Sequence, residues 1–212
     1  MQYLRFMLTK KILLSIPLAC CLCLFGGMKC NKIVCDPRQK YSFEIGVKAF
    51  PDKDSVHVHD TIWLVINTPD TLIDLLSNEL IEYSGVENLG SVISFQKLNG
   101  NAFTVKALNK FALILKEGKK VNNTIDTELF DEYLFSDKKG YYQFVLGMVP
   151  MEVGTFGIIV GSAANVYRES DKCSKASFTM NFKETNQHYY LNPNFQGGPI
   201  PVGGDYYFKV VE

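Results

Sequence analysis

Alternation of apolar and polar residues over short segments most limits what this 212-residue chain can fold into. In residues 41–49 every second side chain is large and apolar, namely Tyr41, Phe43, Ile45 and Val47. Because successive side chains of a β-strand point to opposite faces, this pattern predicts a half-buried strand. Similar patterns predict further strands over residues 55–67, 91–97, 103–107, 111–115, 141–148, 155–161, 176–182 and 206–211.

One of these segments contains an uninterrupted apolar run. Residues 61–66 read Thr-Ile-Trp-Leu-Val-Ile, rich in β-branched side chains and containing Trp63, the chain's single tryptophan. A continuous run of this kind is typical of a strand that is covered on both faces. We therefore expect Trp63 to lie in the core.

Helical patterns are few. Thr71 to Glu82 places Leu72, Leu76 and Leu80 four residues apart behind a capping Asp70, although its second half, Glu79 to Tyr83, equally suits a strand. A second short helix is predicted over Thr127 to Phe135. Many short strands divided by Asn-Gly and Gly-rich turns predict an all-β fold: an immunoglobulin-like or related β-sandwich with one or two short helices.

The first 27 residues have a composition of their own. Arg5, Lys10 and Lys11 precede the apolar tract Ile12–Gly27, which is broken by Pro17 and is shorter than the roughly 20 residues of a spanning helix. We expect a signal segment at 1–27, a lead segment at 28–40 and a single sandwich domain at 41–212. The chain is thus predicted to be exported to the periplasm, the outer membrane or the cell exterior.

How the signal ends is open. Leu18-Ala19-Cys20-Cys21 is similar to the box of bacterial lipoproteins, which makes Cys20 and Cys21 candidates for lipidation and for membrane association. Pro17 and the apolar stretch that continues through Phe25 depart from that box. Ordinary cleavage near Gly26 or Gly27 is the second alternative, and an uncleaved anchor is the third.

Setting the signal aside changes the charge and the cysteine count. Three of the 22 basic residues fall within 1–27, so the remaining 19 face 22 acidic residues and the net charge becomes −3. Without a basic surface we expect no nucleic-acid partner. Cys30, Cys35 and Cys173 remain, and in an oxidising compartment we predict a Cys35–Cys173 disulfide, with Cys30 in the lead segment. Three cysteines without an adjacent histidine are a poor zinc set.

A short stretch favours the immunoglobulin-like interpretation. Residues 148–160 join two predicted strands through Pro150, Glu152 and Gly154, with Phe156 two residues after the glycine. This stretch resembles the corner of many extracellular immunoglobulin-like domains, where a tyrosine hydroxyl bonds to the backbone. Phe156 lacks that hydroxyl.

Features spread along most of the chain resemble a group of uncharacterised envelope proteins from Bacteroidota. They are a lipoprotein-like start, the early Cys35-Asp-Pro37, the strand Asp60-Thr-Ile-Trp-Leu64, Gly154-Thr-Phe156, the late Cys173 and the closing Tyr206-Tyr-Phe-Lys-Val210. The departure is Gly26-Gly-Met-Lys-Cys30, which stands where the lipoprotein box is usual. The resemblance implies a β fold and a surface location, and no activity.

A second resemblance concerns modification. Secreted Bacteroides proteins are O-glycosylated at Asp, then Ser or Thr, then an apolar residue, and this pattern occurs at Asp54-Ser-Val56, Asp60-Thr-Ile62 and Asp70-Thr-Leu72. Such triplets also occur where a turn enters a strand. Because modification requires an exposed loop, Ser55 and Thr71 are the candidates, and we expect Thr61 to be buried with its strand.

Candidates for chemistry are sparse. On an unbroken strand His57 and His59 would share one face, about 7 Å apart, which makes them weak candidates for metal ligands. The alternative is a solvated polar face opposite Val56 and Val58, and we expect no metal or other cofactor. The sequence has no Gly-x-Ser-x-Gly elbow and no phosphate-binding glycine loop, and we predict no catalytic residues.

The tyrosine doublets give the best indication of binding. Tyr189, Tyr190, Tyr206 and Tyr207 flank a Pro- and Gly-rich loop at 192–204. Exposed aromatic rings on loops bind sugars and peptides, but strand alternation should send one ring of each doublet into the core. The sequence therefore predicts a non-enzymatic interaction or structural module with an unknown protein or glycan partner. The alternatives are a glycan- or peptide-binding accessory lipoprotein and a metal-dependent hydrolase using His57 and His59.

Overall fold

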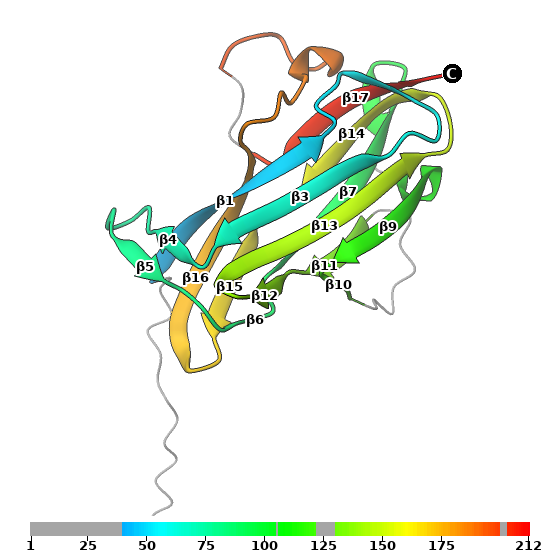
Figure 1. The fold of residues 1–212 in the computed structure, drawn as a ribbon. Helices are drawn as coiled ribbons and strands as arrows, with labels where there is room; N and C mark the ends of the chain where they lie inside the picture. The colour runs from blue at the N-terminus through cyan, green and yellow to red at the C-terminus, as the bar shows by residue number, and fades with distance from the viewer. Residues whose placement is uncertain (1–39, 105, 122–129, 200–202) are drawn as a thin grey trace, which may run out of the picture. The chain divides into compact units, whose positions relative to one another are not determined.

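Two β-sheets lie face to face in a computed structural model of the chain, and the strands carry almost all of the secondary structure (Figure 1). The structure describes residues 40–104, 106–121, 130–199 and 203–212. The all-β sandwich prediction is confirmed. The predicted signal segment, Cys20, Cys21, Cys30 and Cys35 lie outside the described residues, so lipidation and the Cys35–Cys173 disulfide stay predictions.

The first sheet has the order β12-β13-β3-β1-β16-β15-β6, and β9 also pairs with β13. Its strands are β1 (Tyr41–Phe50), β3 (Ile62–Pro69), β6 (Val86–Glu87), β9 (Phe111–Glu117), β12 (Ser136–Lys138), β13 (Tyr141–Pro150), β15 (Ala163–Arg168) and β16 (Asp171–Phe182). β1 runs parallel to β16 and antiparallel to β3.

The second sheet has the order β10-β11-β7-β14-β17-β2, and β8 also pairs with β7. Its strands are β2 (Ser55–His57), β7 (Gly90–Asn99), β8 (Ala102–Thr104), β10 (Lys119–Lys120), β11 (Phe130–Leu134), β14 (Gly154–Val160) and β17 (Asp205–Val211). A separate hairpin is formed by β4 (Thr71–Ile73) and β5 (Leu80–Glu82), and two 3-10 turns are η1 (Leu108–Lys110) and η2 (Tyr189–Leu191).

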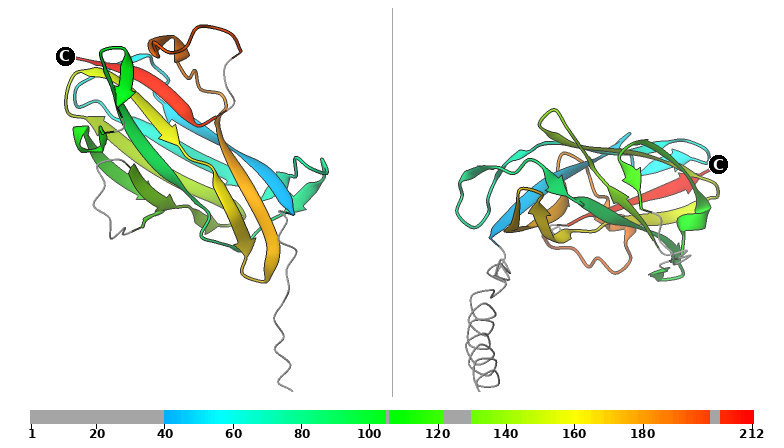
Figure 2. Two further views of the ribbon diagram at one scale, coloured as in Figure 1. Left: turned by 180° about the vertical axis from the view of Figure 1, so that it is seen from behind. Right: turned by 90° about the horizontal axis from the view of Figure 1, so that it is seen from below.

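Seven strands follow the order of an immunoglobulin sandwich. In chain order β1, β3, β7, β9, β13, β14 and β17 take the places of strands A to G, because β1-β3-β13-β9 reproduces A-B-E-D and β7-β14-β17 reproduces C-F-G. The chain then departs from that plan between β14 and β17. The β15–β16 hairpin is inserted there and extends the first sheet beyond β1, as Figure 2 shows from behind.

The core is built from the predicted alternation. Phe43, Ile45 and Val47 of β1 are buried, while Glu44 and Lys48 point to the opposite face. The same period buries the inward side chains of β3, β13, β14, β16 and β17, and these make one hydrophobic cluster between the sheets. β-branched and aromatic residues suit such a pleated, half-buried surface, which explains why these segments form strands.

The corner between the two sheets also matches its prediction. β13 ends at Pro150 in the first sheet, and β14 begins at Gly154 in the second sheet. Phe156 is fully buried, with its ring centroid 5.0 Å from that of Phe111 and 6.0 Å from that of Phe208. Packing among rings thus stabilises a corner at which immunoglobulin-like domains use a tyrosine hydroxyl.

The helix predictions are wrong for the described residues, whereas the strand alternative for Glu79 to Tyr83 is confirmed by β5. Thr71 to Glu82 forms the β4–β5 hairpin, and Phe130 to Leu134, within the second candidate, is β11. In the described part of the chain the only helical turns are η1 and η2, each of three residues. The predicted segment 55–67 is also divided, since β2 ends at His57 and β3 begins at Ile62.

Candidate functional site

The tyrosine doublets do not form an exposed aromatic loop. Tyr189, Tyr206 and Tyr207 are all buried, and only Tyr190 is exposed, with 62% of its surface accessible. The expectation that each doublet keeps one ring in solvent is therefore wrong for Tyr206 and Tyr207.

The reason is that η2 and its flanking residues cover the outer face of β17. The backbone N–H of Tyr207 donates to the carbonyl of Gln187, and the Asn192 amide donates to the Tyr207 hydroxyl over 3.1 Å. The ring of Tyr207 packs against Tyr189, with centroids 5.4 Å apart. Burial raises the pKa of the Tyr207 hydroxyl, as expected for a phenol removed from water.

His188 is the residue that holds this cover to the sandwich. It is buried at a left-handed backbone position, its Nδ1 lies 2.9 Å from the Tyr207 carbonyl oxygen, and its Nε2 lies 3.7 Å from Asp52 Oδ1. The Tyr190 hydroxyl donates to Asp54 Oδ2 over 2.5 Å, which lowers the pKa of the Asp54 carboxyl. The polar groups of this segment are thus engaged in attaching it to the loop between β1 and β2.

His57 and His59 do not share a strand face. β2 ends at His57, and His59 has a positive φ of 71° in the turn that follows, so the strand alternation does not extend to it. The ring of His57 contacts the carbonyl of Glu212, and its backbone N–H donates to Asp60. In the described part of the chain no group of three or more His, Cys, Asp or Glu side chains is placed to hold a metal ion.

The glycosylation candidates can also be placed. Ser55 on β2 and Thr71 on β4 are exposed, whereas Thr61 is half-buried beside the start of β3. The exposure of Ser55 and Thr71 is what modification requires, but their glycosylation stays a prediction.

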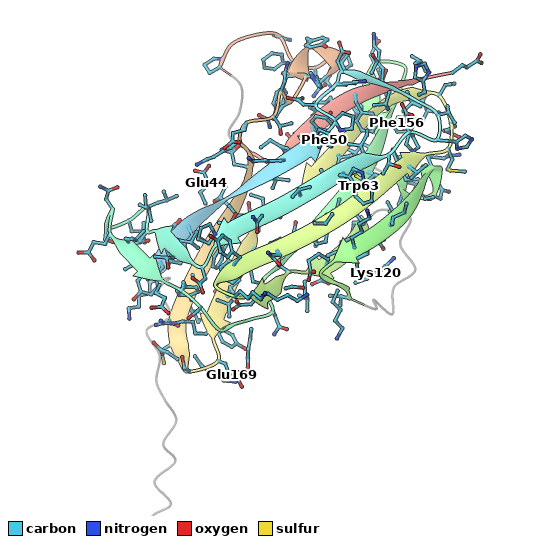
Figure 3. All side chains as sticks on the ribbon, viewed as in Figure 1. Glu44, Phe50, Trp63, Lys120, Phe156 and Glu169 are labelled. Carbon is cyan, nitrogen blue, oxygen red and sulfur yellow. The ribbon has the colours of Figure 1, made fainter. Side chains whose placement is uncertain are left out.

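The first sheet carries an apolar row on its outer face. Phe50 of β1 pairs with Trp63 of β3, Trp63 pairs with Gly147 of β13, and Gly147 pairs with Ile114 of β9. These four residues occupy the outward positions of four neighbouring strands, and we call them the Trp63 row. Phe50 is 65% exposed and Ile114 is 43% exposed. Figure 3 labels Phe50 and Trp63 on the adjacent strands β1 and β3.

Trp63 is therefore not the core anchor that its apolar run predicts. Ile62, Leu64 and Ile66 are buried, but Trp63 and Val65 lie half-buried on the outer face. The indole lies against Gly147, since a Cβ added to that glycine would come within 2.7 Å of the ring. An aromatic ring over a cross-strand glycine is a recognised stabilising pair in sheets. The ammonium of Lys116 lies 4.1 Å from the ring centroid.

A shallow pocket of about 400 Å³ adjoins the Trp63 row on the same face. Its lining is mostly polar or charged and comes from β1, β3 and the residues that follow β16, including Lys48, Asn67, Thr68, Lys183 and Glu184. Lys48 pairs with Glu184. Lys183 lies 2.9 Å from Glu44.

Electrostatics keep this polar part of the face ionised. Burial alone raises the pKa of Glu44, but hydrogen bonds from Lys183 and Asn181 outweigh that effect and hold the pKa below its ordinary value. The carboxylate of Glu44 is thus charged at neutral pH. The face combines the exposed ring of Phe50 and the half-buried ring of Trp63 with hydrogen-bond donors and acceptors.

Such a face can bind a ring-shaped polar molecule. The C–H bonds of a pyranose are attracted to the negative face of an aromatic ring, and hydroxyls can meet the surrounding lysine, amide and carboxylate groups. Sequence reasoning missed this surface because the run at 61–66 indicates burial on both faces. The signal that was available is the glycine at position 147, which leaves room for a large neighbour across the sheet.

Among the described residues, no helix is long and apolar enough to cross a bilayer. No protein-family model matches this chain, and no curated protein sequence matches it.

Proposed function

We propose that this protein is an exported, non-enzymatic binding module of the bacterial cell envelope, and that it holds a glycan on the outer face of the first sheet. The export component rests on the signal-like composition of residues 1–27. The observation that carries the binding component is the Trp63 row, an outward-facing apolar strip across four strands beside a polar pocket, with Phe50 and Ile114 exposed at its two ends.

Two features support a glycan as the ligand. Phe50 and Trp63 are cross-strand neighbours, so two aromatic side chains lie next to each other on the outer face. The adjoining pocket offers hydroxyl, amide, ammonium and carboxylate groups within one short stretch of sheet. Mixed apolar and hydrogen-bonding surfaces of this kind suit polyhydroxylated ligands.

The buried polar groups of the described residues are engaged in hydrogen bonds within the fold. Asp74 accepts hydrogen bonds from Ser42 and Ser77, and Gln187 donates to backbone carbonyls. Within the described residues no buried side-chain nitrogen or oxygen lacks a partner. Polar side chains held in this way stabilise the fold.

The test is affinity electrophoresis of the full chain in gels that contain laminarin, xylan, mannan or solubilised peptidoglycan. We expect at least one polymer to retard the protein, and Trp63→Ala to weaken that binding by about 30-fold, the loss of roughly 2 kcal/mol typical of a central aromatic contact. Tyr190→Ala is the matched control, because this exposed ring lies on the loop that covers β17.

Two results would contradict the proposal. Migration unaffected by every polymer would exclude a glycan from these classes. Weaker binding in Tyr190→Ala, together with unchanged binding in Trp63→Ala, would move the site to the segment around η2.

A further inference from the structure

The β4–β5 hairpin exposes an unusual amount of apolar surface. Ile73, Leu75, Leu76 and Leu80 are 55%, 55%, 66% and 67% exposed, although they fall within eight consecutive residues. Figure 1 shows the hairpin projecting beyond the ends of β1 and β3. Single exposed leucines are common on soluble proteins, but a contiguous group at the tip of a projecting hairpin marks an interaction site.

The fold holds these side chains outward. Asp74, which is 2% exposed, accepts hydrogen bonds from the Ser42 backbone N–H over 2.8 Å and from the Ser77 hydroxyl over 2.8 Å. The N–H of Leu75 donates to the Ser42 carbonyl over 2.7 Å, while Leu72 is buried in the core. The tip is thus fixed to β1, and its leucines cannot turn inward without breaking these bonds.

The position of the hairpin indicates its partner. Its contacts with Ser42 place it at the start of β1, where the described chain begins. The sequence before β1 contains the apolar tract Ile12–Gly27, which directs the chain to a membrane. From Met28 to Lys40 there are 13 residues, which span at most about 43 Å when extended. A chain tethered by that tract therefore keeps the hairpin within about 43 Å of the bilayer, and a lipid at Cys20 or Cys21 would leave at most 20 residues, about 66 Å.

We propose that the tip of the β4–β5 hairpin inserts into the outer part of a lipid bilayer, with Leu75 and Leu76 entering the acyl region. The exposed Glu79 and Glu82 lie on the same hairpin, so apolar insertion and not attraction to anionic lipid drives the contact. This contact depends on export but not on glycan binding, since the Trp63 row lies at the other end of β1 and β3.

Insertion would complement a weak anchor. One acyl chain binds a membrane only marginally and reversibly, and stable attachment takes a second signal. Leu75 and Leu76 supply such a signal, and they also orient the sandwich. β1 runs away from the hairpin for ten residues, about 30 Å, so the Trp63 row would face away from the lipid surface.

Depth-dependent quenching of tryptophan fluorescence tests the proposal on the full chain. Trp63→Phe removes the native tryptophan, and Leu75→Trp or Leu76→Trp then places one at the tip. In Met151→Trp, the matched control, the tryptophan follows β13 at the far end of the sheet, at a similarly exposed position. Each variant is reconstituted into phosphatidylcholine vesicles with and without bromine atoms on the acyl chains.

We expect brominated lipid to remove most of the emission from position 75 or 76 and to leave that from position 151 unchanged. Two tip variants keep the test valid if one of them folds poorly. If brominated lipid quenches the tip tryptophan no more than the tryptophan at position 151, the bilayer contact would be overturned and the leucines would be assigned to a protein partner. Glycan retardation of the wild-type chain is measured separately and is independent of this outcome.

Discussion

The seat of the Trp63 ring on Gly147 can be tested by adding one methyl group. A Cβ at position 147 would lie 2.7 Å from Cζ3, 2.9 Å from Cη2 and 3.1 Å from Cε3 of Trp63. Non-bonded carbon atoms are at their optimum near 3.5–4.0 Å, so Gly147→Ala must displace the ring by about 1 Å. Because the ring is half-buried on an outer face, it can move toward water.

Two opposing effects set the change in the free energy of unfolding of Gly147→Ala. Overpacking of this kind costs about 1–3 kcal/mol, whereas alanine in place of glycine in a strand contributes about 0.5–1 kcal/mol of stability. The free energy of unfolding should therefore fall by roughly 0.5–2 kcal/mol. At about 2–4 °C per kcal/mol for a domain of this size, the melting temperature should fall by a few degrees.

The assay is the emission spectrum, because Trp63 is the only tryptophan in the chain. Gly147→Ala should shift the emission maximum to longer wavelength and weaken glycan binding. Gly46→Ala is the matched control: it lies on the same outer face, but its Cβ would meet only the Lys183 Cβ at 3.9 Å, an ordinary contact. That variant should keep the wild-type spectrum. An unchanged spectrum and melting temperature in Gly147→Ala would refute the packing of the Trp63 ring on Gly147.

Two further predictions concern the start of the sandwich. Burial raises the pKa of Asp74, but hydrogen bonds from Ser42 and Ser77 outweigh that effect and lower the pKa overall. The Asp74 carboxylate therefore stabilises the fold at pH values above its unfolded pKa of about 3.9. This contribution is lost as the pH falls through the lower pKa of the folded state. Asp74→Asn should reduce the free energy of unfolding by about 1–3 kcal/mol at pH 7 and by less near pH 2; a difference that denaturant titrations find constant with pH would contradict this. The next prediction concerns the Cys35–Cys173 disulfide. The N–H of Lys40, five residues after Cys35, donates to the carbonyl of Lys175, two residues after Cys173. Mass spectrometry without reduction should find the linked peptides, and Cys35→Ser should cost about 4–5 kcal/mol whereas Cys30→Ser should not; an unlinked Cys173 peptide would disprove the pairing.

Much of the architecture could be predicted from the sequence because alternation is a direct consequence of strand geometry. The pattern at Tyr41 to Val47 sets both the strand and the face that is buried. The corner at Pro150 and Gly154 likewise marks the passage from β13 to β14. Pairing partners were beyond reach, because β1 meets β16 about 135 residues later and local pattern carries no information on that contact.

The helix prediction over Thr71 to Glu82 is wrong for a specific reason. Leu72, Leu76 and Leu80 are four residues apart, and a spacing of four suits both the 3.6-residue period of a helix and the two-residue period of a strand. What decides the matter is the turn between Leu76 and Leu80, where Asp74 caps Ser77 and Asn78 adopts a positive φ of 60°. Side-chain bonding of this kind favours turns over helix interiors.

The candidate site was mispredicted because alternation indicates which face a residue occupies and not what covers that face. Tyr207 points away from the core of the sandwich, yet η2 covers it. Trp63 also points outward, and its ring remains partly exposed. For His57 and His59, the pattern failed for a different reason, since the left-handed turn at His59 interrupts the strand.

The two parallel pairings give the sandwich a mechanical polarity. β1 lies parallel to β16, and β2 lies parallel to β17. The start of β1 and Glu212 lie at opposite ends of the sandwich (Figure 1). A pull between a tethered amino end and a load at the carboxyl end would slide these strands along each other. The hydrogen bonds of each ladder would then bear the force together instead of opening one at a time, and the fold would resist traction along its length far better than peeling at one edge.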